Sequence, residues 1–220
     1  MLTSPRNRYT YYPDAADVPE TQAVNVHNRS YSIGALVDIP APGAQGVLFA
    51  HGSWFGGHAL YVKDSRLHYV NNFVGIMEQK VVATEDVPTG ENLILSASFD
   101  KDGEDPPGVA TGMLSLYHGD RKVGEGRIRV QPGYFELAGE GLCIGRDGGA
   151  AVTDDYPGER PTGSPAAPST GSPSTSAANP TSTSNARPPP CSPGSKQRPI
   201  VVTAAAGAAA VTRELSGSGR

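Results

Sequence analysis

The chain of 220 residues lacks the features that identify several classes of protein. It has only two cysteines, Cys143 and Cys191, which are too few for a disulfide framework, and we read both as free thiols. No apolar run reaches the ~20 residues that a membrane helix requires, and the N-terminus shows no signal peptide. These absences predict a soluble chain without a membrane partner, and we place it in the cytoplasm.

Cationic side chains are neither numerous nor clustered. Lysine and arginine together number 18 against 22 acidic residues, which gives a formal net charge of −4. Residues 1–160 are acidic, and residues 161–220 are only mildly basic. Nucleic-acid binding needs clustered lysine and arginine to displace phosphate counterions, so we expect no nucleic-acid partner.

The last part of the chain has almost nothing from which a core could form. Residues 161–220 contain no Phe, Tyr or Trp, and Pro, Ser, Thr, Ala and Gly dominate them. Such a segment buries too little apolar surface to offset roughly 1–2 kcal/mol of backbone entropy per ordered residue. We therefore predict an extended segment over residues 1–29, one domain over residues 30–157, and a disordered tail over residues 158–220.

A period of two is the clearest signal in the part that can fold. In residues 46–73, apolar and polar side chains alternate as they do in a half-buried strand. We expect Val47 and Phe49 on one face of this sheet, and Leu48 and Ala50 on the other.

Short strands of this kind recur along the domain, and no segment has a helical period longer than two turns. We predict strands at residues 31–39, 80–84, 92–99, 112–118, 121–124, 127–130, 134–137 and 142–145. The first turn within residues 46–73 is predicted at Gly56-Gly57. Turn signals every 8–12 residues between short strands are typical of an all-β antiparallel β-sandwich of jelly-roll type.

Three histidines are the best candidates for a metal site. His51 and His58 lie on either side of a glycine-rich turn, and His68 falls in the next predicted strand. Zinc is usually held by four protein ligands at structural sites, and no Cys, Asp or Glu is placed to complete the set. We therefore predict neither a metal nor a cofactor.

Other chemical motifs are incomplete. Ser53 lacks the Gly-x-Ser-x-Gly pattern of a nucleophile elbow. The acidic residues of one loop do not have EF-hand spacing, and Pro106 interrupts their series: Asp100, Asp102, Glu104 and Asp105. We accordingly predict no catalytic residue.

Three aromatic residues are the candidate contact residues. Trp54, Tyr61 and Tyr69 lie near the predicted turns, where aromatic rings could form a platform for a sugar. The alternative is that these side chains cover a core edge or an interface between domains.

Two resemblances can be seen in these segments. Residues 46–49, 59–62 and 67–72 resemble laminin-G-like and concanavalin-type jelly rolls, which indicates a fold and no function. More narrowly, the order of segments between about residues 8 and 160 resembles the C-terminal region of long bacterial arylsulfatases. These segments are residues 8–13, 28–31, 46–53, 56–62, 72–75 and 139–145. The resemblance implies a β-rich accessory domain without catalytic groups, whose partner is a sulfatase catalytic domain.

The chain also departs from that family. Trp54 stands where the family has arginine, and Asn71 where it has tyrosine. The formylglycine motif of the family is only imitated at Cys191, because Ser195 stands where the motif needs arginine. The resemblance thus implies a truncated arylsulfatase fragment that is inactive alone. The alternative is a free-standing glycan- or ligand-binding module of laminin-G type.

Overall fold

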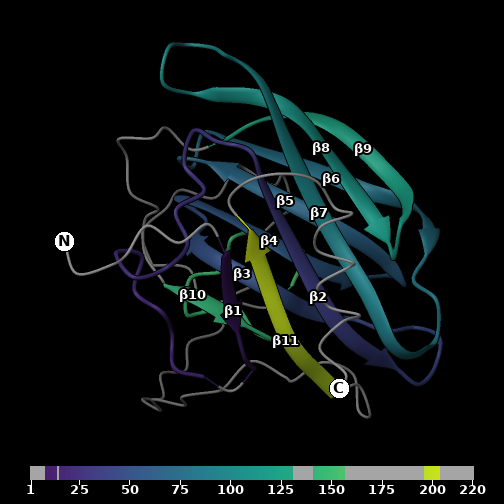
Figure 1. Cartoon of the computed structure of the whole chain (residues 1–220). Helices are drawn as coiled ribbons and strands as arrows, with labels where there is room; N and C mark the ends of the chain where they lie inside the picture. Colours follow the sequence, from purple (N-terminus) through teal and green to yellow (C-terminus); the bar gives the residue numbers. More distant parts are fainter. Residues whose placement is uncertain (1–7, 14, 131–140, 157–195, 204–220) are drawn as a thin grey trace, which may run out of the picture.

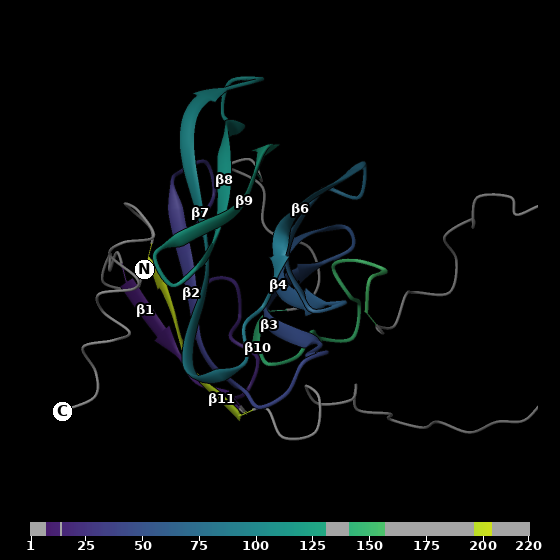
Figure 2. The same cartoon turned by 90° about the vertical axis from the view of Figure 1, so that its right-hand side faces the viewer.

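The computed structural model describes residues 8–13, 15–130, 141–156 and, for the backbone, 196–203. They form two antiparallel sheets that stack face to face, in the orders β1-β11-β2-β7-β8-β9 and β10-β3-β4-β5-β6 (Figures 1 and 2). The strands are β1 (Arg8–Tyr11), β2 (Tyr31–Ile39), β3 (Gly46–Ser53), β4 (Gly56–Lys63), β5 (Arg66–Phe73), β6 (Met77–Asp86), β7 (Gly90–Glu104), β8 (Ala110–His118), β9 (Arg121–Arg129), β10 (Leu142–Ile144) and β11 (Lys196–Thr203). This confirms the predicted all-β antiparallel sandwich. The strand predicted at residues 134–137 lies outside the described residues.

The main core fills the space between the two sheets. Its largest side chains are fully buried and come from both layers: Tyr31, Ile33, Leu95, Phe99, Leu114 and Leu116 from the six-stranded sheet, and Phe49, Leu60, Leu67, Tyr69 and Leu142 from the five-stranded sheet. Complete burial of one such side chain contributes about 1.5–3 kcal/mol, so this layer is the principal source of stability.

The predicted alternation of β3 is wrong at its start. Val47 lies on the outer face with Ala50, whereas Leu48 and Phe49 both belong to the inter-sheet core. The reason is a β-bulge, since the register between β3 and β4 shifts between Val47 and Phe49. An extra residue in one strand breaks the period of two at that point.

The first turn of this region also differs from the prediction. Strand β3 ends at Ser53 and β4 begins at Gly56, so Trp54 and Phe55 form the turn. Gly57 is needed inside β4 instead, because a Cβ there would lie 2.6 Å from the carbonyl oxygen of His51. The glycines of this segment therefore allow a close approach of two backbones rather than a reversal of the chain.

On one side of the sandwich, β6 and β9 of the two sheets are joined by hydrogen bonds from side chains to backbone, and not by backbone pairing. The amide of Gln79 in β6 donates to the carbonyl oxygen of Arg129 in β9 and accepts from its N–H, both at 2.8 Å. Asn71 donates to the same carbonyl oxygen at 2.9 Å, and Thr84 Oγ1 donates to the carbonyl oxygen of Val123 at 2.9 Å. These bonds satisfy backbone polar groups of β9, which lies at the edge of its sheet.

Strand β11 is an exception to the tail that we expected to be unfolded. Residues 196–203 lie between β1 and β2 and pair antiparallel with both. The segment ends in Ile200-Val201-Val202-Thr203, a run of β-branched residues that favours extended backbone. Composition averaged over the whole tail concealed this short run. The rest of the predicted tail lies outside the described residues.

Candidate functional site

The three aromatic residues singled out in the sequence do not converge on one surface. Tyr69 is fully buried in the inter-sheet core, and Tyr61 is 1% exposed on the opposite, outer face of the five-stranded sheet. Trp54 lies in the β3–β4 turn and is partly exposed. Tyr69 in β5 pairs with Leu60 in β4 and shares its face of the sheet. Successive side chains on a strand point to opposite faces, so Tyr61, the next residue after Leu60, lies on the other face.

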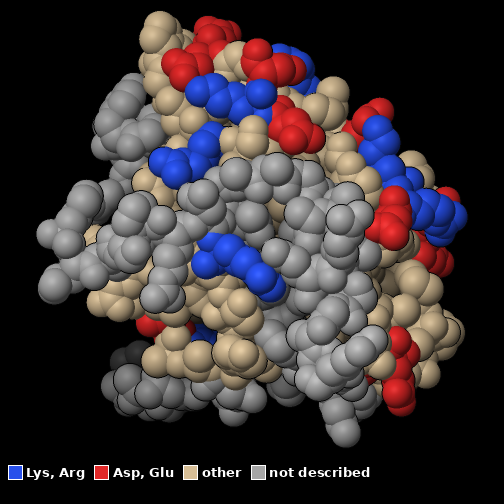
Figure 3. Space-filling view, viewed as in Figure 1, with Lys and Arg blue, Asp and Glu red and all other residues tan. Residues whose placement is uncertain are grey.

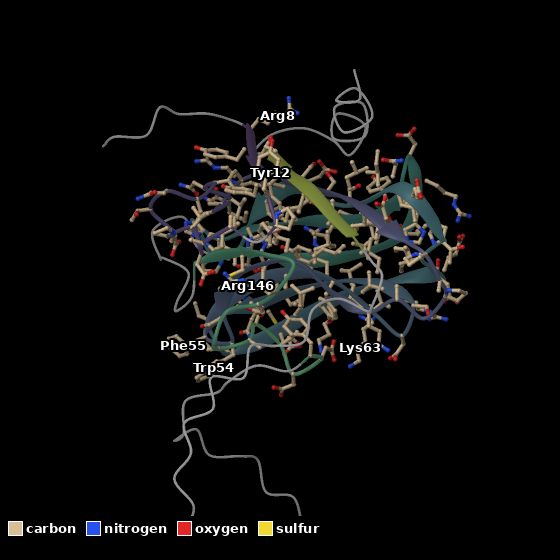
Figure 4. The ribbon with its side chains drawn as sticks, turned by 90° about the horizontal axis from the view of Figure 1, so that it is seen from below. Arg8, Tyr12, Trp54, Phe55, Lys63 and Arg146 are labelled. Atoms are coloured by element: carbon tan, nitrogen blue, oxygen red, sulfur yellow. The ribbon has the colours of Figure 1, made fainter. Side chains whose placement is uncertain are left out.

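Trp54 belongs instead to a surface that the sequence did not predict, which we call the hairpin tip and define by Trp54, Phe55, Ile76 and Met77. Phe55 is 54% exposed and Ile76 82% exposed. The rings of Trp54 and Phe55 meet edge to face with centroids 5.5 Å apart. Figure 4 shows this pair at the margin of the molecule, on the side away from Tyr12.

Two contacts hold Phe55 at the hairpin tip. The N–H of Phe55 donates to Ser53 Oγ at 3.2 Å. A Cβ placed on Gly75 would lie 3.0 Å from the Phe55 ring, so the β5–β6 turn lies against that ring. Phe55 is therefore exposed but held between two adjacent hairpins, and the partly exposed Trp54 ring contacts it edge to face.

Histidines 51 and 58 are buried and not on a binding surface. They face each other across β3 and β4 with ring centroids 5.7 Å apart. His58 Nδ1 is 3.1 Å from the hydroxyl of Tyr69, which in turn hydrogen bonds to the hydroxyl of Tyr31. Burial lowers the pKa of His51 to about 4 and that of His58 well below its usual value, so both rings are neutral at pH 7.

The three candidate histidines do not lie together. His68 stacks on Tyr61 on the outer face, away from the two core histidines. Within the described ranges, no group of three or more His, Cys, Asp or Glu residues is placed to hold a metal ion.

The acidic residues of the β7–β8 region are paired with cations. Asp102 receives two hydrogen bonds from Arg127 at 2.7 Å each. Glu104 accepts from Lys101 Nζ at 2.6 Å, and this contact is the main cause that lowers the pKa of Glu104 to about 2. Figure 3 shows cationic and acidic side chains interleaved on this face of the molecule. Asp102 and Glu104 thus belong to ion pairs and do not form an open acidic site.

Cys143 is not activated as a nucleophile. It is buried in β10, and burial raises the pKa of its thiol to about 12, where the reactive thiolate is scarce at neutral pH. Cys191, the sequence position that imitates the formylglycine motif, lies outside the described residues.

A second arrangement that the sequence did not reveal covers the outer face of the five-stranded sheet. We call residues 146–156 the strap. Val152 of the strap is fully buried against Val47, Ala50, Ala59, Tyr61 and Val70. Asp147 fastens the strap internally, because its carboxylate accepts from the N–H of Val152 at 2.9 Å and from the hydroxyl of Tyr156 at 2.7 Å.

The end of the strap places a carboxylate among three donors. Asp155 accepts from Lys63 Nζ at 2.8 Å, from Lys80 Nζ at 2.9 Å, and from the hydroxyl of Tyr61. Burial works against ionisation of Asp155, but these donors outweigh it and leave its pKa well below the usual range. Burial and the hydrogen bond to Asp155 raise the pKa of Tyr61, so its hydroxyl keeps its proton and donates it.

Comparison with known proteins yields fold neighbours and no family. No family model matches the chain, and no curated protein matches it. Among solved structures, the mouse laminin alpha1 chain, domains LG4-5, is 14% identical with a TM-score of 0.39, over 73% of this chain and 36% of that one. The Ruminococcus gnavus IT-sialidase CBM40 is 11% identical with a TM-score of 0.44, over 87% and 84%. The Caenorhabditis elegans galectin LEC-6 is 12% identical with a TM-score of 0.37, over 64% and 94%.

These neighbours share a β-sandwich architecture with this chain, and their TM-scores below 0.5 support no functional conclusion. The jelly-roll part of the predicted resemblance is in keeping with them, and none of the comparisons supports the arylsulfatase part. In the part of the chain that the structure describes, no helix is long and apolar enough to cross a bilayer.

Proposed function

We propose that this chain is a non-catalytic ligand-binding β-sandwich module that contacts a glycan through the hairpin tip. One observation carries the proposal, namely two aromatic rings in contact at the tip, of which Phe55 is exposed and Trp54 partly exposed. The one hydroxyl–imidazole contact described above, between Tyr69 and His58, is buried in the core, and burial of Cys143 disfavours its thiolate, so neither offers an accessible nucleophile.

The chemistry of the tip suits a saccharide. A sugar ring has an apolar C–H face that can pack on an aromatic ring, and hydroxyl groups that need hydrogen-bonding partners. Tryptophan offers both a large apolar face and an indole N–H donor. Because the Phe55 ring already lies against the β5–β6 turn and contacts the Trp54 ring, it loses little side-chain entropy when the ligand arrives.

A sulfatase catalytic domain is the second candidate partner, as implied by the resemblance in the sequence. The large exposed fractions of Ile76 and Phe55 favour this alternative, because an apolar tip of this kind can also be covered by a neighbouring domain. On that reading the chain remains an accessory domain without its own activity.

Glycan-array screening followed by calorimetric titration of the best saccharide tests the proposal. Trp54→Ala is expected to weaken binding by about tenfold, or ~1.4 kcal/mol, because it removes the larger ring face. Tyr12→Ala is the matched control, since Tyr12 is 60% exposed and lies on the opposite side of the molecule (Figure 4). Equal losses for the two variants, or no saccharide bound at all, would refute a glycan site at the tip. Unchanged thermal melting of both variants excludes unfolding as the cause.

A further inference from the structure

We infer that Tyr61, Lys63 and Lys80 form a latent site for the carboxylate group of an acidic saccharide, and that Asp155 occupies it as a built-in competitor. The inference rests on the proposed function only for the saccharide nature of the ligand. The site itself is defined by three donors that converge on one carboxylate.

The donors sit on rigid strands. Tyr61 and Lys63 are two residues apart in β4 and leave it on the same outer face, and Lys80 lies two strands away in β6. Tyr61 is fixed by stacking on His68 at 5.1 Å and by an edge contact with Tyr156, also at 5.1 Å. The Tyr61 ring is therefore held by contacts other than Asp155, and the backbones of β4 and β6 place Lys63 and Lys80 beside it.

Charge favours replacement of Asp155 by one other anion. Lys80 also binds Glu78 at 2.7 Å, and Glu78 accepts from Thr153 at 2.6 Å. With Asp155 in place, two ammonium groups face two carboxylates. Without it, one positive charge remains uncompensated beside a tyrosine hydroxyl donor, which is the complement that a single carboxylate requires.

The competitor is accessible and can leave by itself. The side chain of Asp155 is 18% exposed to solvent, and those of Lys63 and Lys80 are each 34% exposed. Asp155 lies at the end of the strap, while the buried anchor of the strap is Val152. Rotation of the Asp155 side chain thus uncovers the donors without loss of the contacts that Val152 and Tyr156 make.

The main test compares Asp155→Ala with the natural chain by calorimetry. The probes are a disaccharide that contains glucuronate and its neutral glucose counterpart. If Asp155 fills the site at least nine-tenths of the time, its removal tightens binding of the acidic sugar by about tenfold or more. The neutral sugar should show no such gain.

Two further variants make the comparison specific. Adding Lys63→Met and Lys80→Met to Asp155→Ala should abolish the gain. Glu125→Ala is the matched control, because it frees Lys122 from an exposed pair of 2.6 Å without a converging donor. A gain of equal size for Glu125→Ala, a gain with the neutral sugar, or no gain at all would overturn the inference.

Failure of this site can be told apart from failure of the hairpin tip. Trp54→Ala is added to Asp155→Ala to remove the larger aromatic ring of the hairpin tip. If the carboxylate site exists and the tip does not bind glycan, the gain in affinity for the acidic sugar is unchanged in this double variant. Should Asp155→Ala not fold, hydrogen exchange on the natural chain replaces it. Saturating acidic sugar, but not neutral sugar, should then speed exchange of the amides of residues 153–156. Unchanged exchange would overturn the inference.

Discussion

Acid should destabilise this protein through His51, which is buried opposite His58 in the five-stranded sheet. The folded chain holds His51 neutral, with a pKa of about 4, whereas the unfolded chain binds a proton below about pH 6.5. Because the unfolded state binds more protons, stability falls as the pH drops from about 6.5 to about 4. The difference between these two pKa values corresponds to about 3 kcal/mol. Neighbouring Glu20 acts against the shift and His27 with it, but desolvation is the largest cause.

Urea unfolding at a series of pH values between 7.5 and 4 measures this loss, with tryptophan fluorescence as the signal. The comparison variant is His51→Leu, which fills the site with an apolar side chain that does not titrate. Its stability should change by about 3 kcal/mol less over this range than that of the natural chain. Parallel pH profiles for the two proteins would refute the assignment of the loss to His51.

Three further substitutions test other contacts, each by equilibrium unfolding. Gly57→Ala should cost about 2–3 kcal/mol, because the new Cβ would lie 2.6 Å from a carbonyl oxygen of the facing strand. Tyr69→Phe removes a core hydroxyl that is bonded to Tyr31, and should cost about 1–3 kcal/mol by leaving buried polar groups without partners. Val201→Pro should cost about 3 kcal/mol, because β11 is an inner strand whose backbone pairs on both sides.

Much of the fold could be predicted from local patterns. The strand expected at residues 31–39 is β2 with the same bounds, and the region 46–73 is β3, β4 and β5. In β4 and β5 the side chains keep the period of two expected for residues 46–73, with Tyr61 on the outer face and Tyr69 in the inter-sheet core. The bulge after Val47 could not be predicted, because a bulge is set by pairing with β4 and leaves no mark in the composition of β3.

The candidate surfaces were less predictable than the strands. Trp54 could be chosen as a candidate from its residue type, but its partner Phe55 was not chosen. The turn was predicted at Gly56-Gly57, two residues after its position in the structure, so Phe55 was not recognised as a turn residue. The strap offered still less signal. Asp155 lies 92 residues from Lys63 in sequence, and no local pattern indicates that a surface carboxylate will meet a lysine at that separation.

The strap also explains why the strands of the five-stranded sheet could be identified from the sequence, whereas the face that points to the inter-sheet core could not. Strands β3 and β4 are buried at seven of their eight positions each, on both faces. An antiparallel sheet with one solvated face shows a clean alternation, whereas burial on both faces erases the contrast that distinguishes inside from outside. Here the second cover comes from Val152 and Tyr156, which follow β10 in the chain. The polar groups that this cover buries must then be satisfied locally, which is why Tyr61 and Asp155 meet beneath its end.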